Sequence, residues 1–333
     1  MIKLPAPQKE DPKPDDGAPV ARGRFCNNDG RHRVSTSDFL RWRLGLRKEA
    51  GDKGRPVWEA IPLQEARCFD GDSQPGITWI GHATLLYQLR GLTLLTDPIF
   101  SSLPNIKRHQ PPALSLGALP ELDAVLISHN HMDHLDRHSV MGLSRDQLFV
   151  VPLGMASWFH RRGRRHVVEL DWWESVRLGD YRITFVPAQH WSRRSVLDEN
   201  RSLWGGFVVE GPDTALYYSG DTAYFEGFAE IGERLKPEVA LLPIGAYTPR
   251  WIMQGQHLDP TEALQAFGDL GAKVLLPIHW GCFRLSEEPL GEPPAWLEAL
   301  AKEKGLEEQV HLWPIGGGYP LKASARVVKG HTL

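Results

Sequence analysis

Residues 124–134 read Ala-Val-Leu-Ile-Ser-His-Asn-His-Met-Asp-His, and this segment says the most about the architecture. Its first four residues are apolar, which predicts a buried strand. Three imidazoles and one carboxylate follow within six residues, and these are nitrogen and oxygen ligands that zinc prefers. Burying four such groups without a metal would leave polar atoms without partners, so we expect a metal site at this strand end. The four residues are His129, His131, Asp133 and His134.

One such cluster cannot complete the ligand shells of two metal ions, so further ligands are expected at the ends of other strands. Three ionisable residues have this placement, each just after an apolar run. They are His190, Asp221 and His279. Because the same placement recurs, one sheet edge could gather all of these side chains into a single pocket.

Composition narrows the class of protein. A chain of 333 residues fits two domains or one large α/β domain, and 41% hydrophobic with 24% charged residues is typical of a folded protein. The net charge of -3 gives no reason to expect a nucleic-acid partner. Cys26, Cys68 and Cys282 form no C-x-x-C pair, which argues against a disulfide framework or a thiolate zinc site. A reducing, cytoplasmic location fits best.

The N-terminal quarter differs from the rest of the chain. Prolines among alternating charges predict a disordered arm over residues 1–24, and residues 25–75 are expected to form an extension packed on the main domain over residues 76–333. Phe39, Trp42 and Leu46 recur at helical spacing beside arginines. Such a helix could lie on an anionic lipid surface or pack on its own domain.

From residue 76 onward, short β-rich runs alternate irregularly with helical stretches. Mixed elements of this kind predict an α/β fold of two mixed sheets flanked by helices. Strands are expected at 77–80, 85–89, 92–96, 124–128, 147–152, 181–187, 207–210, 215–219, 239–244, 273–278 and 310–314. Helices are expected near 138–144, 154–162, 222–235, 260–270 and 293–304.

The order of the candidate ligands resembles the metallo-β-lactamase superfamily. Further motifs, from about Phe25 to the end of the chain, resemble the N-acyl-phosphatidylethanolamine-hydrolysing phospholipase D family and its bacterial relatives. These motifs are Trp79-Ile-Gly-His-Ala-Thr84, Leu95-Thr-Asp-Pro-Ile-Phe-Ser101, Ala188-Gln-His-Trp-Ser192, Leu203-Trp-Gly-Gly-Phe207, Ser219-Gly-Asp-Thr222, Pro243-Ile-Gly-Ala-Tyr247, Pro249-Arg-Trp251 and Ile278-His-Trp-Gly281.

The resemblance implies a four-layer αββα sandwich with two zinc ions at its open edge. Carried over by position, one zinc would take His129, His131 and His190. The other would take Asp133, His134 and His279, with Asp221 bridging the pair. Iron or manganese in place of zinc would keep the same geometry. Two metals that share a hydroxide can hydrolyse a phosphodiester, so Asp133 and Asp221 also count as catalytic candidates.

Five further residues are candidates for supporting roles. Asp97 is expected either to orient a ligand imidazole or to form an Asx turn before Pro98. His82 is expected to support a ligand or to be structural. The resemblance places His257 at the substrate mouth, as a catalytic and substrate-binding residue. Trp191 and Tyr247 could line the pocket, although aromatic residues beside strands more often belong to the core.

The favoured activity is phospholipase D-type cleavage of N-acyl-phosphatidylethanolamine or a related phosphodiester. One alternative is hydrolysis of a small soluble anion such as a sugar-phosphate lactone, and another is a non-catalytic metal- or ligand-binding protein. Peripheral contact with a membrane and a homodimer are the other expected partners. Residues 101–110 are shorter than the family's usual loop, which affects the expected acyl-chain or head-group preference.

Overall fold

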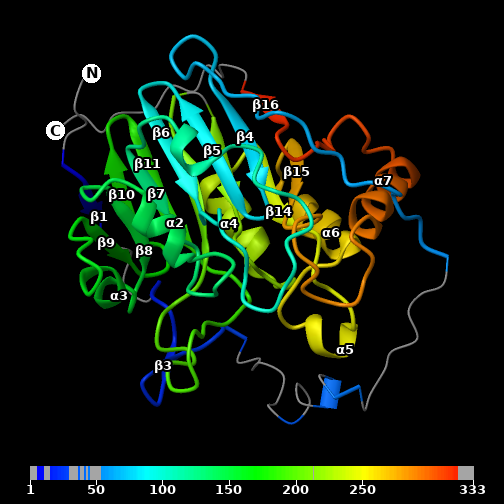
Figure 1. The fold of residues 1–333 in the computed structure, drawn as a ribbon, viewed down its shortest axis with the longest axis horizontal. Helices are drawn as coiled ribbons and strands as arrows, with labels where there is room; N and C mark the ends of the chain where they lie inside the picture. Colours follow the sequence, from blue (N-terminus) through cyan, green and yellow to red (C-terminus); the bar gives the residue numbers. More distant parts are fainter. Residues whose placement is uncertain are drawn as a thin grey trace.

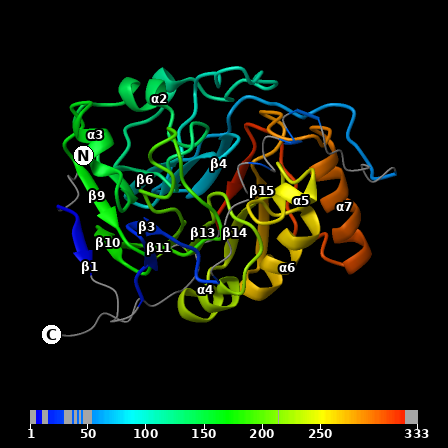
Figure 2. The same cartoon turned by 90° about the horizontal axis from the view of Figure 1, so that it is seen from below.

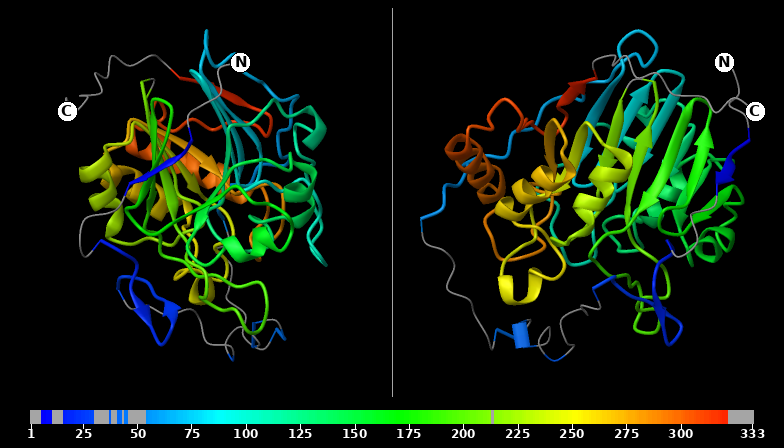
Figure 3. Two further views of the ribbon diagram at one scale, coloured as in Figure 1. Left: turned by 90° about the vertical axis from the view of Figure 1, so that its left-hand side faces the viewer. Right: turned by 180° about the vertical axis from the view of Figure 1, so that it is seen from behind.

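Two seven-stranded mixed sheets lie face to face in the computed structural model, with helices on their outer sides (Figures 1 and 3). The left view of Figure 3 shows both sheets edge-on. The prediction of an α/β fold with two mixed sheets flanked by helices is confirmed. The structure describes residues 6–10, 16–29, 37, 41–42, 44–45, 54–212 and 214–321.

The first sheet combines an antiparallel and a parallel half. In spatial order its strands are β16 (Gly318–Pro320), β4 (Gly76–Gly81), β5 (Thr84–Leu89), β6 (Leu92–Thr96), β7 (Ala124–Leu126), β8 (Phe149–Pro152) and β9 (Val167–Leu170). Pairs from β16 to β6 are antiparallel, and pairs from β6 to β9 are parallel. The apolar strands β7 and β8 are buried throughout, as expected where both faces of a parallel sheet are covered.

The second sheet has the same mixed character. Its strands are β1 (Gln8–Glu10), β10 (Ser175–Leu178), β11 (Tyr181–Val186), β12 (Gly206–Glu210), β13 (Ala215–Tyr218), β14 (Val239–Pro243) and β15 (Val274–Ile278). Neighbouring strands pair antiparallel from β1 to β13 and parallel from β13 to β15. A small hairpin of β2 (Val20–Ala21) and β3 (Arg24–Phe25) lies apart from both sheets.

The helices form the two outer layers (Figure 2). On the first sheet lie α2 (Arg137–Gly142) and α3 (Ala156–His160), and on the second α4 (Gly227–Leu235), α6 (Pro260–Leu270) and α7 (Glu292–Lys304). The short elements are α5 (Arg250–Met253) and the 3-10 helix η1 (Leu116–Ala118). The start of α6 follows from its sequence, because Asp259 and Glu262 form a reciprocal capping box around Pro260.

Alternation along the strands divides the apolar residues between two cores. Leu85 and Leu94 face the second sheet and join the large core between the sheets. Leu86 and Leu95, one residue further, point to the other face and pack with residues of α2 and α3. The period of two residues in a strand therefore builds an inner and an outer core from the same segments.

Several sequence expectations differ from the structure. The expected strand at 310–314 is reduced to one bridge between Val310 and Leu275, while β9, β10 and β16 were not predicted. The helix expected from 222 begins at Gly227, because residues 221–226 form the loop that carries Asp221.

The structure also corrects the prediction of a disordered N-terminal arm. Residues 8–10 are not disordered, since they pair with Ser175–Arg177 as an edge strand that needs only backbone hydrogen bonds. The proposed helix residues Phe39 and Leu46 lie outside the described residues. Within the described part of the chain, no helix has the length and apolar character needed to cross a bilayer. The domain boundaries remain predictions.

The inner core yields a stability prediction. The Phe207 and Phe185 rings, 5.0 Å apart, are fully buried in it. We expect Phe207→Ala to lower the free energy of unfolding by about 3–5 kcal/mol, because it removes apolar contacts and leaves a cavity. The half-exposed Val57 is the control, and Val57→Ala should change the free energy by less than about 0.5 kcal/mol. Denaturant unfolding checks both, and similar values for the two variants would contradict the core assignment.

Candidate metal centre

The seven predicted ligands come from four strand ends at one edge of the sandwich. Strands β13, β14 and β15 are parallel, and β11 runs in their direction because β12 is antiparallel to both of its neighbours. The carboxyl ends of β11, β13 and β15 therefore meet, and His190, Asp221 and His279 follow them. The segment 128–134 follows β7 of the facing sheet and completes the cluster.

The first group of ligand atoms is built around His131. Its Nδ1 lies 2.8 Å from His129 Nε2 and 3.2 Å from His190 Nε2. Asp221 Oδ2 lies 3.9 Å from the Nε2 atoms of both His129 and His190. Three nitrogens and one carboxylate oxygen thus converge on one point.

The second group lies beside the first and shares Asp221. His134 Nε2 is 3.3 Å from His279 Nε2 and 3.1 Å from Asp221 Oδ2. His279 Nε2 is 3.1 Å from Asp221 Oδ1, and Asp133 Oδ2 is 3.5 Å from His134 Nε2. Because Asp221 Oδ2 also lies 3.9 Å from the Nε2 atoms of His129 and His190, this carboxylate lies between the two groups.

Hydrogen bonds at the far ring nitrogens fix where the imidazole protons lie. His190 Nδ1 donates to the Gln256 carbonyl at 2.9 Å, and His134 Nδ1 donates to Asp97 Oδ2 at 2.7 Å. Ser128 Oγ donates to Asp97, so it accepts from His129 Nδ1 at 2.9 Å. The Nε2 atoms of His129 and His190 therefore carry lone pairs that point into the cluster, and His134 Nε2 points into it beside Asp221.

This arrangement fits a metal ion. Zinc bound at about 2.0–2.1 Å in a tetrahedron holds its ligand atoms about 3.3 Å apart, close to the spacing between the histidine nitrogens. Among the described residues, Asp221 Oδ1 is buried without a hydrogen-bond donor. The donor set is therefore chemically complete for a cation and incomplete without one.

The pKa values of the clustered residues are shifted by their burial and by the charges of their neighbours. Burial alone would lower the pKa of His134, but Asp221 and Asp133 raise it well above its usual value. Burial would raise the pKa of Asp221, yet His134 and His279 hold it well below its ordinary range. Burial together with His134 and His131 lowers the pKa of His129. The carboxylates therefore stay ionised and His129 stays neutral, as metal ligands must, and the proton that the carboxylates favour on His134 is the one that a bound cation would displace.

Asp97 connects the centre to both sheets. It is fully buried, and its carboxylate accepts from the Ser128 backbone N–H at 2.7 Å, from the hydroxyls of Ser128 and Tyr218, and from His134. The side chain is thus engaged with residues far along the chain and not in a local Asx turn. Its placement against His134 agrees with the expected orienting role.

His82 holds the second carboxylate ligand in the same manner. Its Nε2 lies 3.1 Å from Asp133 Oδ2, and its ring packs on that of His279 with centroids 4.0 Å apart. Burial and the neighbouring His279 lower the pKa of His82 to about 3, so the ring is neutral. The geometry matches the supporting alternative for His82.

The expected substrate residues divide into two cases. His257 Nδ1 is 3.9 Å from Asp221 Oδ2, and the Trp191 ring lies 4.4 Å from that of His131, so both border the cluster. Tyr247 does not reach it. Its side chain is fully buried and its hydroxyl donates to Glu292 at 2.6 Å, which turns it toward α7.

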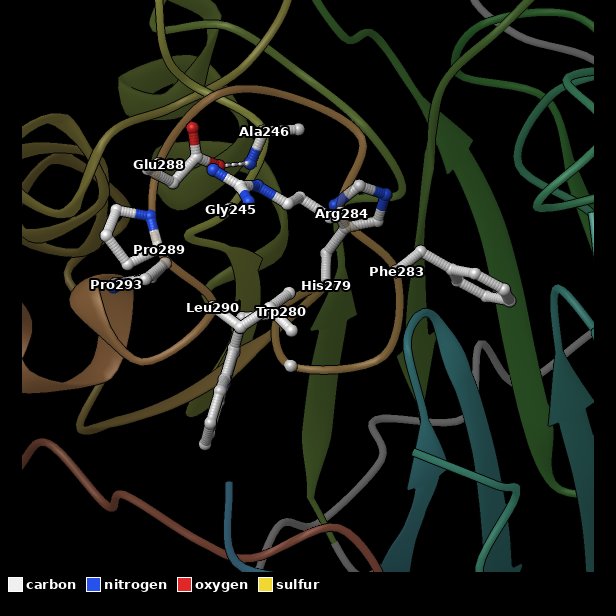
Figure 4. Close-up of a pocket in the computed structure, with 11 residues that line it drawn as sticks. Gly245, Ala246, His279, Trp280, Phe283, Arg284, Glu288, Pro289, Leu290 and Pro293 are labelled. Atoms are coloured by element: carbon white, nitrogen blue, oxygen red, sulfur yellow. Dashed lines mark hydrogen bonds between the residues drawn. The ribbon is translucent and has the colours of Figure 1, made fainter. Parts of the chain in front are cut away.

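A small hollow adjoins the centre beside His279 (Figure 4). Arg284, Glu288 and Trp280 also line it. Glu288 accepts from the backbone N–H groups of Ala246 at 2.7 Å and Thr248 at 3.0 Å, so it fixes the loop after β14. The hollow lies on the side of His279 that faces this loop.

Arg194 is a site residue that the sequence did not indicate. Its guanidinium donates to the carbonyls of Asn130 at 2.9 Å, His131 at 3.3 Å and Leu135 at 2.7 Å. It thereby ties the loop after His190 to the loop that carries the clustered ligands. Its position four residues after His190 could have drawn attention to it. A sequence does not, however, distinguish an arginine that binds loop carbonyls from one that faces solvent.

The geometry around Asp97 predicts the effect of an isosteric change. Asp97→Asn replaces one carboxylate oxygen by an NH2 group. That group is a hydrogen-bond donor, and it would face one of the present donors to Asp97, which include Ser128 N–H, His134 Nδ1 and the Tyr218 hydroxyl. We expect metal affinity to fall by about 10–100-fold, measured by competition with a chelator. Tyr218→Phe removes one of these donors and should have a smaller effect. Equal affinities for Asp97→Asn and the parent would contradict the orienting role.

Comparison with known proteins identifies the family. Residues 93–280 match the Beta-lactamase superfamily domain. The chain is 37% identical over 268 residues to N-acyl-phosphatidylethanolamine-hydrolyzing phospholipase D 1 of Caenorhabditis elegans, which covers 74% of each protein. It is 38% identical over 254 residues to the mitochondrial N-acyl-phosphatidylethanolamine-hydrolyzing phospholipase D of Saccharomyces cerevisiae, covering 72% of this chain and 54% of the yeast protein.

A solved structure supports the fold. A metallo hydrolase from the archaeon Ignicoccus hospitalis aligns with a TM-score of 0.60 at 22% identity, over 75% of this chain and 99% of that one. The matched domain contains all seven candidate ligands, and the aligned fold is the same αββα sandwich. The chain therefore belongs to the beta-lactamase superfamily, and it is a metal-dependent hydrolase of the metallo-β-lactamase fold.

Proposed function

We propose that the protein is a dinuclear zinc hydrolase that cleaves a phosphodiester, most readily that of N-acyl-phosphatidylethanolamine or a related phospholipid. The observation that carries this proposal is the pair of ligand groups that share Asp221, with imidazole nitrogens facing one another at 2.8–3.3 Å. Two adjacent groups are what a two-metal phosphodiesterase requires.

The donor set favours zinc. In the proposal one ion takes His129, His131 and His190, the other takes Asp133, His134 and His279, and Asp221 bridges them. Imidazole nitrogens with a few carboxylate oxygens suit zinc, and the absence of thiolate and of oxygen-rich surroundings argues against copper(I) and calcium. Iron or manganese in the same ligands would be an alternative cofactor.

Zinc ions held there would polarise a phosphoryl oxygen and lower the pKa of water enough to supply a nucleophile near neutral pH. The chain's own residues hold and orient this machinery. Asp97 and His82 fix His134 and Asp133, and the Gln256 carbonyl fixes the ring of His190. Preorganised ligands of this kind need no rearrangement during the reaction.

His257 is the proposed contact for a substrate phosphate. Its side chain is 12% exposed at the edge of the centre, and its Nδ1 has no hydrogen-bond partner in the described residues. Trp191 lies on the other side, with its Nε1 donating to Gln256 at 2.7 Å, so the ring face is left to line the entrance. Asp133 and Asp221 act as ligands within the catalytic centre.

Two relatives support the choice of substrate. The similar proteins of Caenorhabditis elegans and Saccharomyces cerevisiae are named for hydrolysing N-acyl-phosphatidylethanolamine, and both exceed 35% identity to this chain. A phospholipid substrate requires the protein to work at a membrane surface, so peripheral membrane contact is part of the proposal. A homodimer and a cytoplasmic location remain predictions.

A turnover screen tests the activity. Zinc-loaded protein should release phosphatidic acid and N-acylethanolamine from N-acyl-phosphatidylethanolamine, at a rate well above its rates on a sugar-phosphate lactone and on a β-lactam. Faster turnover of the lactone would favour the alternative of a small soluble anionic substrate. No turnover of any substrate by the metal-loaded protein would favour a non-catalytic binding protein.

Metal content is the first prediction from the two ligand groups. Purified, zinc-replete protein should hold close to two zinc ions per chain, because both groups are nearly complete. Elemental analysis measures this. Asp221→Ala should lower the content and reduce activity by several orders of magnitude while the fold persists. A value of one or less in the parent, or activity of Asp221→Ala within about tenfold of it, would contradict the dinuclear proposal.

His257 should separate substrate binding from metal binding. His257→Ala should keep the zinc content and lower kcat/KM by about 10–1,000-fold, the scale of a lost charge-assisted contact or acid–base group. His129→Ala is the matched comparison and should lose metal and activity together. Loss of zinc from His257→Ala would make it a ligand, and unchanged kinetics would return it to a structural role.

A further inference from the structure

The loop after His190 presents two adjacent apolar side chains to solvent. Val196 is 80% exposed and Leu197 is 74% exposed, the highest values among the large hydrophobic residues that the structure describes. Single exposed apolar residues are common on protein surfaces, but two consecutive ones at a loop apex are not explained by core packing. We call residues 193–198 the apolar tip.

Hydrogen bonds fix the shape of the apolar tip. At its base, Asn200 N–H donates to the Ser192 carbonyl at 2.8 Å, and Ser192 N–H donates to Asn200 Oδ1 at 3.1 Å. Within it, Asp198 Oδ1 accepts from the N–H groups of Arg194 at 3.0 Å and Ser195 at 2.7 Å. The loop therefore holds Val196 and Leu197 outward, and a fixed outward pose lowers the entropy lost when they bind a partner.

The apolar tip is joined to the metal centre and to a second exposed segment. Arg194 connects it to the ligand loop, where Met132 is 46% exposed. Phe25 N–H donates to the Asn200 carbonyl at 2.9 Å and joins it to the β2–β3 hairpin, where Val20 is 60% exposed. Exposed apolar side chains therefore come from three segments that these hydrogen bonds connect. In Figure 1 the hairpin strand β3 and α5 both lie in the lower part of the molecule.

The charge around this surface differs from that of the whole protein. Residues 20–25 and 191–201 contain five arginines and two acidic residues, while the complete chain has a formal net charge of -3. The five are Arg22, Arg24, Arg193, Arg194 and Arg201. A basic region beside exposed apolar side chains complements a surface that offers anionic groups above an apolar interior.

We propose that the apolar tip and the β2–β3 hairpin dock onto an anionic lipid bilayer. Val20, Val196 and Leu197 enter the boundary between head groups and acyl chains, and the exposed Arg22 and Arg201 contact lipid phosphates. The inference rests on the proposed function, because docking there places the metal centre next to its phospholipid substrate. It adds which surface binds the membrane and which lipid charge that surface selects.

Vesicle binding tests the proposal with the full-length, zinc-loaded protein. One set of vesicles is phosphatidylcholine alone, and the other contains about one third phosphatidylglycerol. The parent should bind the anionic vesicles at least about tenfold more tightly than the neutral ones, and salt should weaken the binding. V196D/L197D should reduce binding by about tenfold or more, and R22E/R201E should abolish the preference for anionic lipid.

Matched controls separate docking from general effects of charge and folding. K302E/K304E makes the same change of charge as R22E/R201E, but on α7, and should bind like the parent. V57D adds an aspartate at another exposed apolar residue and should also bind normally. Thermal unfolding of each variant verifies that it is folded. If V196D/L197D unfolds, V196S/L197S takes its place.

Each result decides the proposal. Equal binding by V196D/L197D and the parent, or no binding of the parent to either vesicle, overturns it. A parent dimer that this variant abolishes, without vesicle binding, assigns the surface to a second copy and overturns it too. On a short-chain N-acyl-phosphatidylethanolamine present as monomers, V196D/L197D should keep the parent's activity. If the parent binds vesicles through the tip but cleaves no lipid, the docking surface stands and the proposed function fails.

Discussion

Imidazole nitrogens whose lone pairs face one another about 3 Å apart repel unless a cation lies between them, and this constraint governs the open edge of the sandwich. To hold six ligand groups and a shared carboxylate in that pose, their outer atoms must be fixed. Asp97, Ser128 and the Gln256 carbonyl do so for three histidines, and His82 does so for Asp133. The buried polar network is therefore determined by the metal centre.

That network also joins the two sheets. Asp97 follows β6 of the first sheet, while Tyr218, which donates to it, ends β13 of the second. The backbone near the centre is unusual as well, because His82, Asp97 and His279 have φ of 56°, 34° and 62°. Such left-handed conformations cost about 1 kcal/mol or more each and persist where contacts over-determine them. The His279 N–H to His82 carbonyl bond, 3.0 Å long, is one of those contacts.

The sequence predicts the parts of the site that strands deliver. His190, Asp221 and His279 each follow an apolar run, so their convergence could be inferred from sheet topology alone. Partners in the network could not, since Asp97 meets Ser128 and Tyr218 only after folding, 31 and 121 residues further along the chain. Tyr247 is a candidate pocket residue in the sequence because it follows a strand, but its hydroxyl donates to Glu292 instead. Nothing in the sequence indicates that direction. The edge strand at 8–10 has no apolar alternation to reveal it.

Fold and substrate preference therefore have different physical origins in this protein. The Ignicoccus hospitalis structure shares the sandwich at 22% identity, so the fold tolerates extensive change in sequence and does not specify a substrate. The loop after His190 is different, because one segment carries a ligand, the Arg194 bridge to the ligand loop and the exposed Val196 and Leu197. Changes at Arg194 therefore act on the metal centre, whereas changes at Val196 and Leu197 act on the surrounding surface. Substrate choice should accordingly follow the sequence of this loop more closely than the sequence of the strands.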